Sequence, residues 1–149
     1  MGGTGKINHL IITAPSARFE EVVQWYIKTL CPLGYIELHR FPGTVGLGPD
    51  GHADFWISAK EDWTQSPIHV GFTAADHATV EAFHKAGIDA GGECHGAPGL
   101  RTHYHANYFA AFLLDPLGNN IEAVNIFLVL LVLAKAQGLI KISQVDHGM

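Results

Sequence analysis

The stretch His9-Leu-Ile-Ile-Thr-Ala14 is matched sixty residues later by His69-Val-Gly-Phe-Thr-Ala74. Histidine, threonine and alanine coincide in the two stretches. Both are short apolar runs rich in β-branched residues, a pattern that is typical of a strand. Because each copy is followed by the same order of predicted elements, the match indicates a duplicated supersecondary unit.

The first copy predicts one helix among four strands. Pro15 and Ser16 open the helix, with Ser16 as its N-cap, and apolar residues then recur every three or four positions as far as Leu30. Pro32 and Gly34 end it. The predicted strands of this copy cover residues 7–14, 35–41, 44–47 and 53–59. The first copy therefore has the order βαβββ.

The second copy predicts the same order. Its helix is capped by Asp76 and closes near Gly87. Its strands cover residues 68–73, 90–94, 108–114 and 120–124. The sequence therefore predicts an α+β domain over residues 1–125, built from two βαβββ units at about 6–60 and 67–125.

An apolar tail follows this domain at residues 126–149. It starts with an unbroken apolar run from Ile126 to Ala134. Because a membrane-spanning helix needs about 20 such residues, the tail predicts no membrane span. We interpret the tail either as a helix or strand that packs on the domain or on a second subunit, or as an exposed face that causes association.

The composition excludes several classes of protein. The 149 residues are 48% hydrophobic and 15% charged, which is typical of a globular domain and not of a disordered chain. The formal charge is −5 and the few basic residues are scattered, so we expect no nucleic-acid surface. Two cysteines cannot build a disulfide framework, and residues 1–10 carry no secretory signal. We therefore expect a cytoplasmic protein with reduced thiols.

Ten histidines outnumber the nine lysines and arginines, which draws attention to metal binding and proton transfer. His9 and His69 occupy equivalent strand positions, and Gly71 leaves space for a ligand on the face of His69. Glu122 lies in an apolar strand, where a buried carboxylate is costly unless a cation compensates its charge. These three side chains predict a metal site with open positions. The alternative is that each is an ordinary half-buried side chain.

The paired βαβββ units, the two strand histidines and the segment Asp115-Pro-Leu-Gly-Asn-Asn-Ile-Glu122 resemble the vicinal oxygen chelate superfamily. That superfamily includes glyoxalase I, extradiol dioxygenases, fosfomycin-resistance thiol transferases and bleomycin-resistance proteins. The resemblance covers about residues 6–124. It implies a glyoxalase-like fold, a cup-shaped half-open β-barrel with one divalent metal ion held by His9, His69 and Glu122. It also implies that the site is assembled across a homodimer, as in many short members.

One departure from glyoxalase I follows from this resemblance. That enzyme has a fourth ligand, a carboxylate on the last strand of the first unit, and the matching position here is Trp56. Asp54 lies on the same strand face, and the disfavoured alternative is that it substitutes for this ligand from an offset position. The missing acid argues against a glyoxalase I activity. We expect Trp56 to contact the substrate, the alternative being that it packs in the core.

A second polar cluster precedes the strand at 108–114. Arg101, His103 and His105 alternate, so in an extended segment they point the same way. We expect Arg101 to bind an anionic oxygen and Tyr104 to contact the substrate. We expect His103 or His105 to act as general acid or base, with Tyr108 as a hydroxyl donor. The alternatives are a solvated polar loop, or a loop in which the two histidines are metal ligands themselves.

The sequence therefore predicts a metal-dependent enzyme that acts on a small oxygenated organic substrate, with a Zn, Mn, Fe, Co or Ni ion as Lewis acid. Dioxygenase, lyase, isomerase and thiol-transferase chemistry stay open, because the superfamily shares the metal step and differs afterward. The alternative is a metal-free protein that sequesters a small molecule, as bleomycin-resistance members do. A third hypothesis is an interaction domain in which the apolar tail binds the partner.

Overall fold

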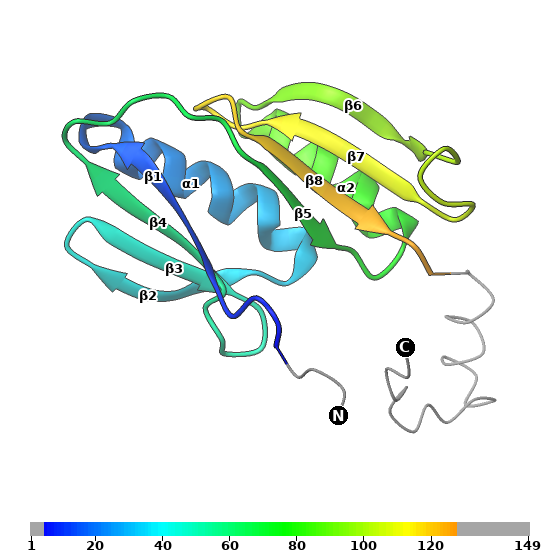
Figure 1. The fold of residues 1–149 in the computed structure, drawn as a ribbon, viewed down its shortest axis with the longest axis horizontal. Coiled ribbons are helices and arrows are strands. Elements are labelled where there is room, and N and C mark those ends of the chain that lie inside the picture. Colours follow the sequence, from blue (N-terminus) through cyan, green and yellow to red (C-terminus); the bar gives the residue numbers. More distant parts are fainter. Residues whose placement is uncertain (1–4, 128–149) are drawn as a thin grey trace.

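A computed structural model describes residues 5–127 of the chain (Figure 1). Its elements in chain order are β1 (Leu10–Pro15), the 3₁₀ turn η1 (Ser16–Arg18), α1 (Phe19–Leu30), the 3₁₀ turn η2 (Cys31–Leu33), β2 (Ile36–Phe41), β3 (Thr44–Gly48), β4 (Phe55–Lys60), β5 (His69–Thr73), α2 (His77–Asp89), β6 (Glu93–Leu100), β7 (Phe109–Leu114) and β8 (Asn120–Asn125). Neither helix of this described part is long and apolar enough to cross a membrane. Nearly all of the predicted apolar tail lies outside the described residues.

Each unit builds its own four-stranded mixed sheet. The strand orders are β1-β4-β3-β2 and β5-β8-β7-β6. In both sheets the first strand of the unit pairs in parallel with the last strand, and the other pairings are antiparallel. The predicted α+β class with two βαβββ units is confirmed, and the two sheets do not close into a barrel.

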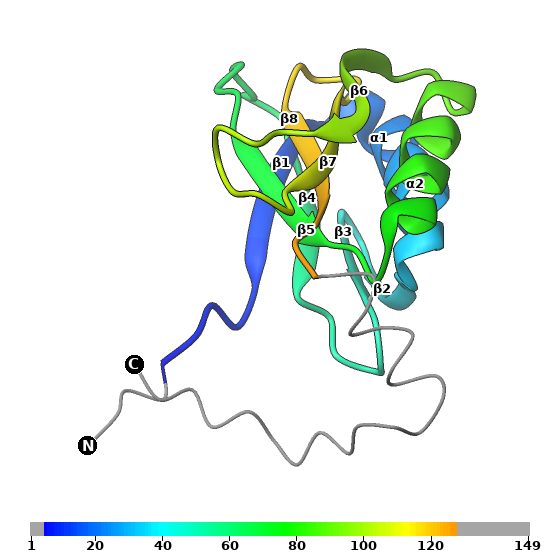
Figure 2. The ribbon, with the colours of Figure 1, turned by 90° about the vertical axis from the view of Figure 1, so that its right-hand side faces the viewer.

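The two helices pack against each other on one face of the sheets, and the described residues leave the opposite face uncovered (Figure 2). Ile12 and Ala14 of β1 are buried toward the helices, whereas Ile11 between them is 52% exposed. This alternation follows from the period of two in a strand. One face of each sheet is therefore filled with core, and functional side chains have to be sought on the other, open face.

The two units share one hydrophobic core. Buried side chains of both helices and both sheets belong to a single cluster. A Cβ atom at Gly87 of α2 would lie 2.3 Å from Cδ1 of Leu113 in β7, so glycine allows the helix to approach the sheet closely. The indole nitrogen of Trp25 in α1 donates to the Gly87 carbonyl oxygen at 3.1 Å. The helix of the first unit is thus bonded to the helix of the second.

The structure differs from the sequence prediction at the start of the first unit. β1 begins at Leu10, so His9 precedes the strand and does not lie in its middle. Ser16 is not the helix N-cap, because it starts the turn η1 and makes no capping hydrogen bond. The helix α1 begins only at Phe19. The reason is that β1 continues through Pro15, and the chain has to turn before it can become helical.

The second unit agrees with the prediction at its helix and differs at the next strand. Asp76 caps α2 and accepts a hydrogen bond from the backbone nitrogen of Thr79 at 2.7 Å. The following strand is not at residues 90–94 but at Glu93–Leu100. Gly91, with a φ of 100°, prolongs the turn after α2 and delays the strand.

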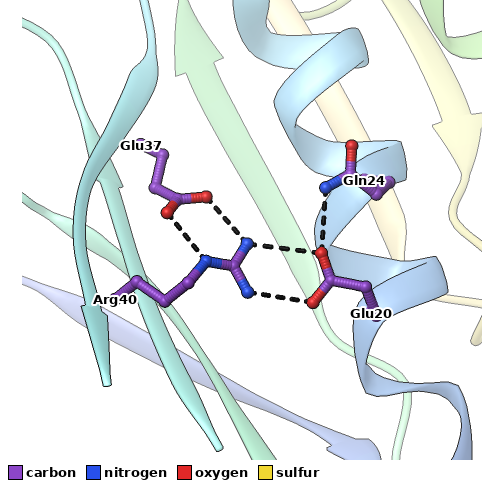
Figure 3. A network of polar contacts seen from close by, with 4 residues as sticks. All are labelled: Glu20, Gln24, Glu37 and Arg40. Carbon is purple, nitrogen blue, oxygen red and sulfur yellow. Dashed lines mark hydrogen bonds and ion pairs between the residues drawn. The ribbon is translucent and has the colours of Figure 1, made fainter. Parts of the chain in front are cut away.

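A network of charged side chains connects the edge strand β2 with α1 (Figure 3). Arg40 of β2 donates to Glu37 on its own strand at 2.8 Å and to Glu20 of α1 at 2.9 Å. Gln24, one helical turn further along α1, also donates to Glu20 at 2.9 Å. The hydrogen bonds raise the pKa of Arg40 and lower those of the two glutamates. The network orients β2 relative to α1. Because it is largely exposed, it adds little to the free energy of unfolding.

A buried carboxylate organises the turn before β8. Asp115 accepts hydrogen bonds from the backbone nitrogens of Leu117 and Asn119, both at 2.8 Å. It also accepts from Nδ2 of Asn119 at 2.8 Å and from the hydroxyl of Tyr26 in α1 at 2.5 Å. Burial, and next the charge of Asp115, raise the pKa of Tyr26 well above its usual value, so this hydroxyl stays a neutral donor. The turn that starts β8 is therefore tied to the helix of the other unit.

Tyr26→Phe removes this hydroxyl alone. We expect it to lower the free energy of unfolding by about 1–3 kcal/mol, because Asp115 would remain buried and charged with one donor fewer. Urea unfolding measures the change. Tyr104→Phe is the matched control, since Tyr104 is 64% exposed and its change should stay within about 0.5 kcal/mol. Equal losses in the two variants would contradict the role given to Asp115.

Candidate functional site

Glu122 lies in the middle of β8 on the open face of the second sheet, yet it is only 4% exposed. Its neighbours across the sheet are Gly71 of β5 and Phe112 of β7. A Cβ atom at Gly71 would lie 3.4 Å from Oε2 of Glu122. The glycine therefore leaves room for the carboxylate to lie against the strand.

Two side chains bond to the Glu122 carboxylate. Nε2 of His69 lies 2.8 Å from Oε2, and the hydroxyl of Tyr108 donates to Oε1 at 2.5 Å. On the far side of the imidazole, Nδ2 of Asn120 donates to Nδ1 of His69 at 2.8 Å. Because Nδ1 accepts this bond, the proton of the neutral imidazole is on Nε2 and points toward Glu122. The carboxylate is thus desolvated and held by two hydrogen-bond donors.

Tyr108 is a neutral donor over the whole physiological range. Burial, followed by the hydrogen bond and the charge of Glu122, raises the pKa of Tyr108 to about 12. The ring of Tyr104 packs against it, with 5.2 Å between the ring centroids. Two tyrosines that the sequence assigns to the site therefore lie together beside the buried carboxylate.

The segment that leads to Tyr108 is not extended, so the predicted alternation of Arg101, His103 and His105 is wrong. The backbone nitrogens of Tyr104 and His105 both donate to the carbonyl oxygen of Arg101, which curls the segment into a turn. The turn is required because β6 and β7 are antiparallel and the chain must reverse between them. His103 and His105 are exposed and form no hydrogen bond with the buried carboxylate. Their role in catalysis stays a prediction.

The guanidinium of Arg101 turns back over the open face. Its Cζ lies 5.6 Å from the centroid of the Phe112 ring. A Cβ atom at Gly96 or Gly99 would come within 3.4 Å or 3.0 Å of the guanidinium nitrogens, so these glycines make the space in which it lies. Phe112 is the neighbour of Glu122 in the sheet. Within residues 5–127 no carboxylate pairs with Arg101, which leaves its charge available to an anion.

His9 lies beside the other sheet, in the segment immediately before β1. Its Nδ1 donates to Oδ1 of Asn8 at 2.9 Å, which leaves the lone pair of Nε2 free. Among the described residues, no group of three or more His, Cys, Asp or Glu side chains is close enough to hold one metal ion. A single chain therefore brings together His69 and Glu122 of the predicted triad, but not His9.

Trp56 is the counterpart of Glu122 in the first unit. Ile11 pairs with Trp56 in the same way that Gly71 pairs with Glu122. The strand register therefore agrees with the sequence prediction that the first unit has no acid at this position. Asp54 does not take over the place, because it precedes β4 and accepts a hydrogen bond from a tyrosine hydroxyl at 3.1 Å.

Aromatic rings line the open face of the first sheet. The indole of Trp56 lies against Gly46, where a Cβ atom would be 2.8 Å from the ring. The ring of His39 is nearly parallel to it, at an angle of 2° with 5.8 Å between the centroids. With His9 these two rings border a hollow of about 320 Å³. The hollow suits a flat apolar group.

Asn120 is the site residue that sequence reasoning missed. It is the only described side chain that bonds to Nδ1 of His69. The available signal was its spacing, because a residue two positions before Glu122 lies on the same face of the strand.

The donor set suits a divalent transition-metal ion. A carboxylate and a neutral imidazole are ligands that Zn, Mn, Fe, Co and Ni accept. Glu122 is a desolvated negative charge with no Lys or Arg ion-pair partner in the described part of the chain, which is costly unless a cation compensates it. His69 and Glu122 therefore fit two positions of a metal site.

Solved structures similar to this chain are glyoxalase-like proteins. A glyoxalase/bleomycin resistance protein from Albidiferax ferrireducens T118 is 25% identical with a TM-score of 0.65, covering 78% of this chain and 95% of that one. A glyoxalase/bleomycin resistance protein/dioxygenase family enzyme from Burkholderia phytofirmans PsJN is 21% identical with a TM-score of 0.65. The match covers 83% of this chain and 100% of that one. A glyoxalase-related enzyme from Fulvimarina pelagi is 14% identical with a TM-score of 0.58, covering 76% and 84%.

No protein-family model matches the chain, and no curated protein matches it by sequence. The likeness to solved structures nevertheless spans almost the whole length of the first two proteins. It agrees with the duplicated βαβββ order and with the open sheets. The chain therefore has the glyoxalase-like fold of these proteins.

Proposed function

We propose that this chain is a metal-dependent enzyme that acts on a small oxygenated organic molecule. The observation that carries the proposal is the buried carboxylate of Glu122, which His69 and Tyr108 align and which has no Lys or Arg partner among residues 5–127. A divalent ion held by His69 and Glu122 would stabilise negative charge on a substrate oxygen as a Lewis acid. Dioxygenase, lyase, isomerase and thiol-transfer reactions are all compatible with this role.

We propose that a second copy of the chain supplies the third ligand. His9 lies beside the first sheet, apart from His69 and Glu122. Apolar side chains are exposed on the open face of that sheet, with Ile11 52% and Phe41 56% exposed. A symmetric homodimer would bring the first unit of each copy to the second unit of the other. His9 of the partner subunit would then complete each site.

Arg101 and Tyr108 are the residues that would meet the substrate oxygens. Arg101 would bind an anionic group, because its guanidinium lies over the neighbour of Glu122 and has no carboxylate partner in the described part of the chain. Tyr108 would hold Glu122 in place and donate its hydroxyl, since its raised pKa keeps it protonated. These contacts favour a substrate with a carboxylate or another anionic oxygen.

The remaining predicted residues would surround the substrate. Trp56 would contribute an aromatic wall from the first sheet, and Tyr104 would contribute one beside Tyr108. His103 or His105 would move a proton from the exposed turn. The two histidines could act only if the bound substrate contacted this turn.

A metal-free protein that sequesters a small molecule is the second candidate. The nearly parallel rings of Trp56 and His39 beside an open hollow favour it, because such a surface can bind a flat ligand without chemistry. Two of the similar structures are described as glyoxalase/bleomycin resistance proteins. The two candidates differ in whether the protein binds a metal.

Elemental analysis of the purified chain without a histidine tag tests the metal. We expect about one divalent ion per chain in the wild type and none in His69→Ala or Glu122→Ala, because each change removes a ligand. A variant with both His103→Ala and His105→Ala is the matched control. It removes two imidazoles from the exposed turn and should keep the metal.

Full metal content in His69→Ala would overturn the assignment of the ligands. No metal in the wild type, even after incubation with Mn, Zn, Fe(II) and Ni, would favour the sequestering protein. Loss of the metal in the control variant would instead indicate that His103 and His105 bind the metal.

A mixed dimer tests whether the site is shared between subunits. His9→Ala and His69→Ala should each lack metal when purified alone. In a heterodimer of the two, one site keeps all its ligands, so random mixing at equal amounts should recover about a quarter of an ion per chain. Co-expression with two different affinity tags, neither of them histidine-rich, followed by elemental analysis, measures this recovery. No recovery in an isolated heterodimer would show that each site belongs to one chain.

The hydrogen bond from Tyr108 to Glu122 predicts a pH dependence. Because the pKa of Tyr108 is raised from 10 to about 12, the bond contributes fully below pH 10 and is lost as the pH rises through about 12. Glu122→Gln removes the charge and should move the ionisation of Tyr108 back toward pH 10. The tyrosinate absorbance, taken as a difference against Tyr108→Phe, measures it. An ionisation that Glu122→Gln leaves unchanged would contradict the contact.

A further inference from the structure

His9 and His69 are both bonded through Nδ1 to an asparagine, but in opposite senses. At His9 the oxygen Oδ1 of Asn8 lies 2.9 Å from Nδ1, so Nδ1 carries the proton and donates it. At His69 the nitrogen Nδ2 of Asn120 lies 2.8 Å from Nδ1, so Nδ1 accepts and the proton is on Nε2. In their neutral forms the two imidazoles are therefore opposite tautomers.

Only one of these tautomers can bind a cation through Nε2. Nε2 of His9 has a free lone pair, whereas the Nε2–H of His69 donates to Oε2 of Glu122 at 2.8 Å. A cation at Nε2 of His69 requires the proton to leave Nε2 and a proton to be taken up at Nδ1, so the ring stays neutral. The amide nitrogen of Asn120 would then face an N–H group, and the hydrogen bond would be lost unless the amide turned.

No second hydrogen bond fixes the orientation of the Asn120 amide in the described part of the chain. The Oδ1 atom of this amide is buried and has no hydrogen-bond partner among the described residues, so His69 alone orients the amide. Rotation of the amide by half a turn exchanges the positions of Oδ1 and Nδ2. In either orientation one of the two atoms faces His69 and the other has no hydrogen-bond partner. The cost of turning is therefore small. In the turned position Oδ1 accepts from the Nδ1–H of His69, as partners of metal-binding histidines commonly do.

We infer that Asn8 and Asn120 are positioning residues of the proposed metal site, Asn8 by keeping His9 in the cation-binding tautomer and Asn120 by supporting both tautomers of His69 through rotation of its amide. This inference rests on the proposed function. Without a cation, His69 and Glu122 satisfy each other. When a cation binds between them, Asn120 supplies the acceptor that the new tautomer needs.

The tautomers can be observed without measuring activity. Long-range ¹H–¹⁵N correlation spectra of protein with ¹⁵N-labelled imidazoles show which ring nitrogen carries the proton, and His9→Ala and His69→Ala assign the two signals. In the metal-free protein we expect the proton of His9 on Nδ1 and that of His69 on Nε2. With zinc bound, we expect the proton of His69 on Nδ1. A metal-free His69 with its proton on Nδ1 would overturn the inference.

Zinc affinity tests the positioning role. Asn120→Leu keeps the approximate size of the side chain but removes both donor and acceptor, and should weaken zinc binding by about 10–100-fold. Asn120→Asp retains an acceptor for the Nδ1–H and should bind zinc at least as tightly as the wild type. Asn8→Leu should weaken binding and release His9 from its single tautomer. Asn107→Leu is the matched control, because Asn107 lies in the turn before β7 and its side chain bonds to neither histidine.

The outcomes separate this inference from the proposed function. If the wild type binds zinc and both leucine variants at Asn8 and Asn120 bind it equally well, the inference is wrong and the proposed function stands. If the wild type binds no zinc, both are wrong. Circular dichroism of each variant confirms that a lost affinity does not come from unfolding.

Discussion

The parallel pairing of β5 with β8 places Gly71 beside Glu122 and His69 beside Asn120. Parallel strands cannot be joined by a tight turn, so this pairing requires the whole unit between them to fold. His69 and Glu122, 53 residues apart, reach hydrogen-bond distance only in consequence. The site is therefore built on two strands of the sheet, and Tyr108, immediately before β7, adds a second hydrogen bond to the Glu122 carboxylate. The buried turn around Asp115 anchors the beginning of β8 to α1.

The same pairing operates in the first unit with different side chains. Ile11 lies beside Trp56 where Gly71 lies beside Glu122, so the equivalent place holds an indole and not a carboxylate. One unit therefore presents an acidic, histidine-paired face and the other an aromatic face with a second histidine. In the proposed homodimer the two faces would form one site, and association of two copies would use both of them.

Sequence reasoning predicted the structure correctly where hydrophobic periodicity or a repeated position indicated it. The alternation of β1, the apolar face of α1 and the cap at Asp76 are local patterns, and the structure has the corresponding elements. It failed at Ser16 and over residues 101–105, because the exact place where a strand ends depends on its partner strand. Asn120 was missed for a related reason, since nothing in its neighbours along the chain shows that it meets His69.

The sequence by itself determined the duplicated βαβββ order and the α+β class, because the repeat, the hydrophobic periodicity and the turn residues are local features of the chain. It also pointed to His69, because its place repeats that of His9, and to Glu122, because it is a carboxylate in an apolar strand. The tertiary structure decided which side chains touch: Tyr108 and Asn120 join His69 and Glu122, whereas His9 lies beside the other sheet. The physical reason is that hydrogen bonds depend on distances of a few tenths of an ångström across paired strands, and only the folded register determines these distances.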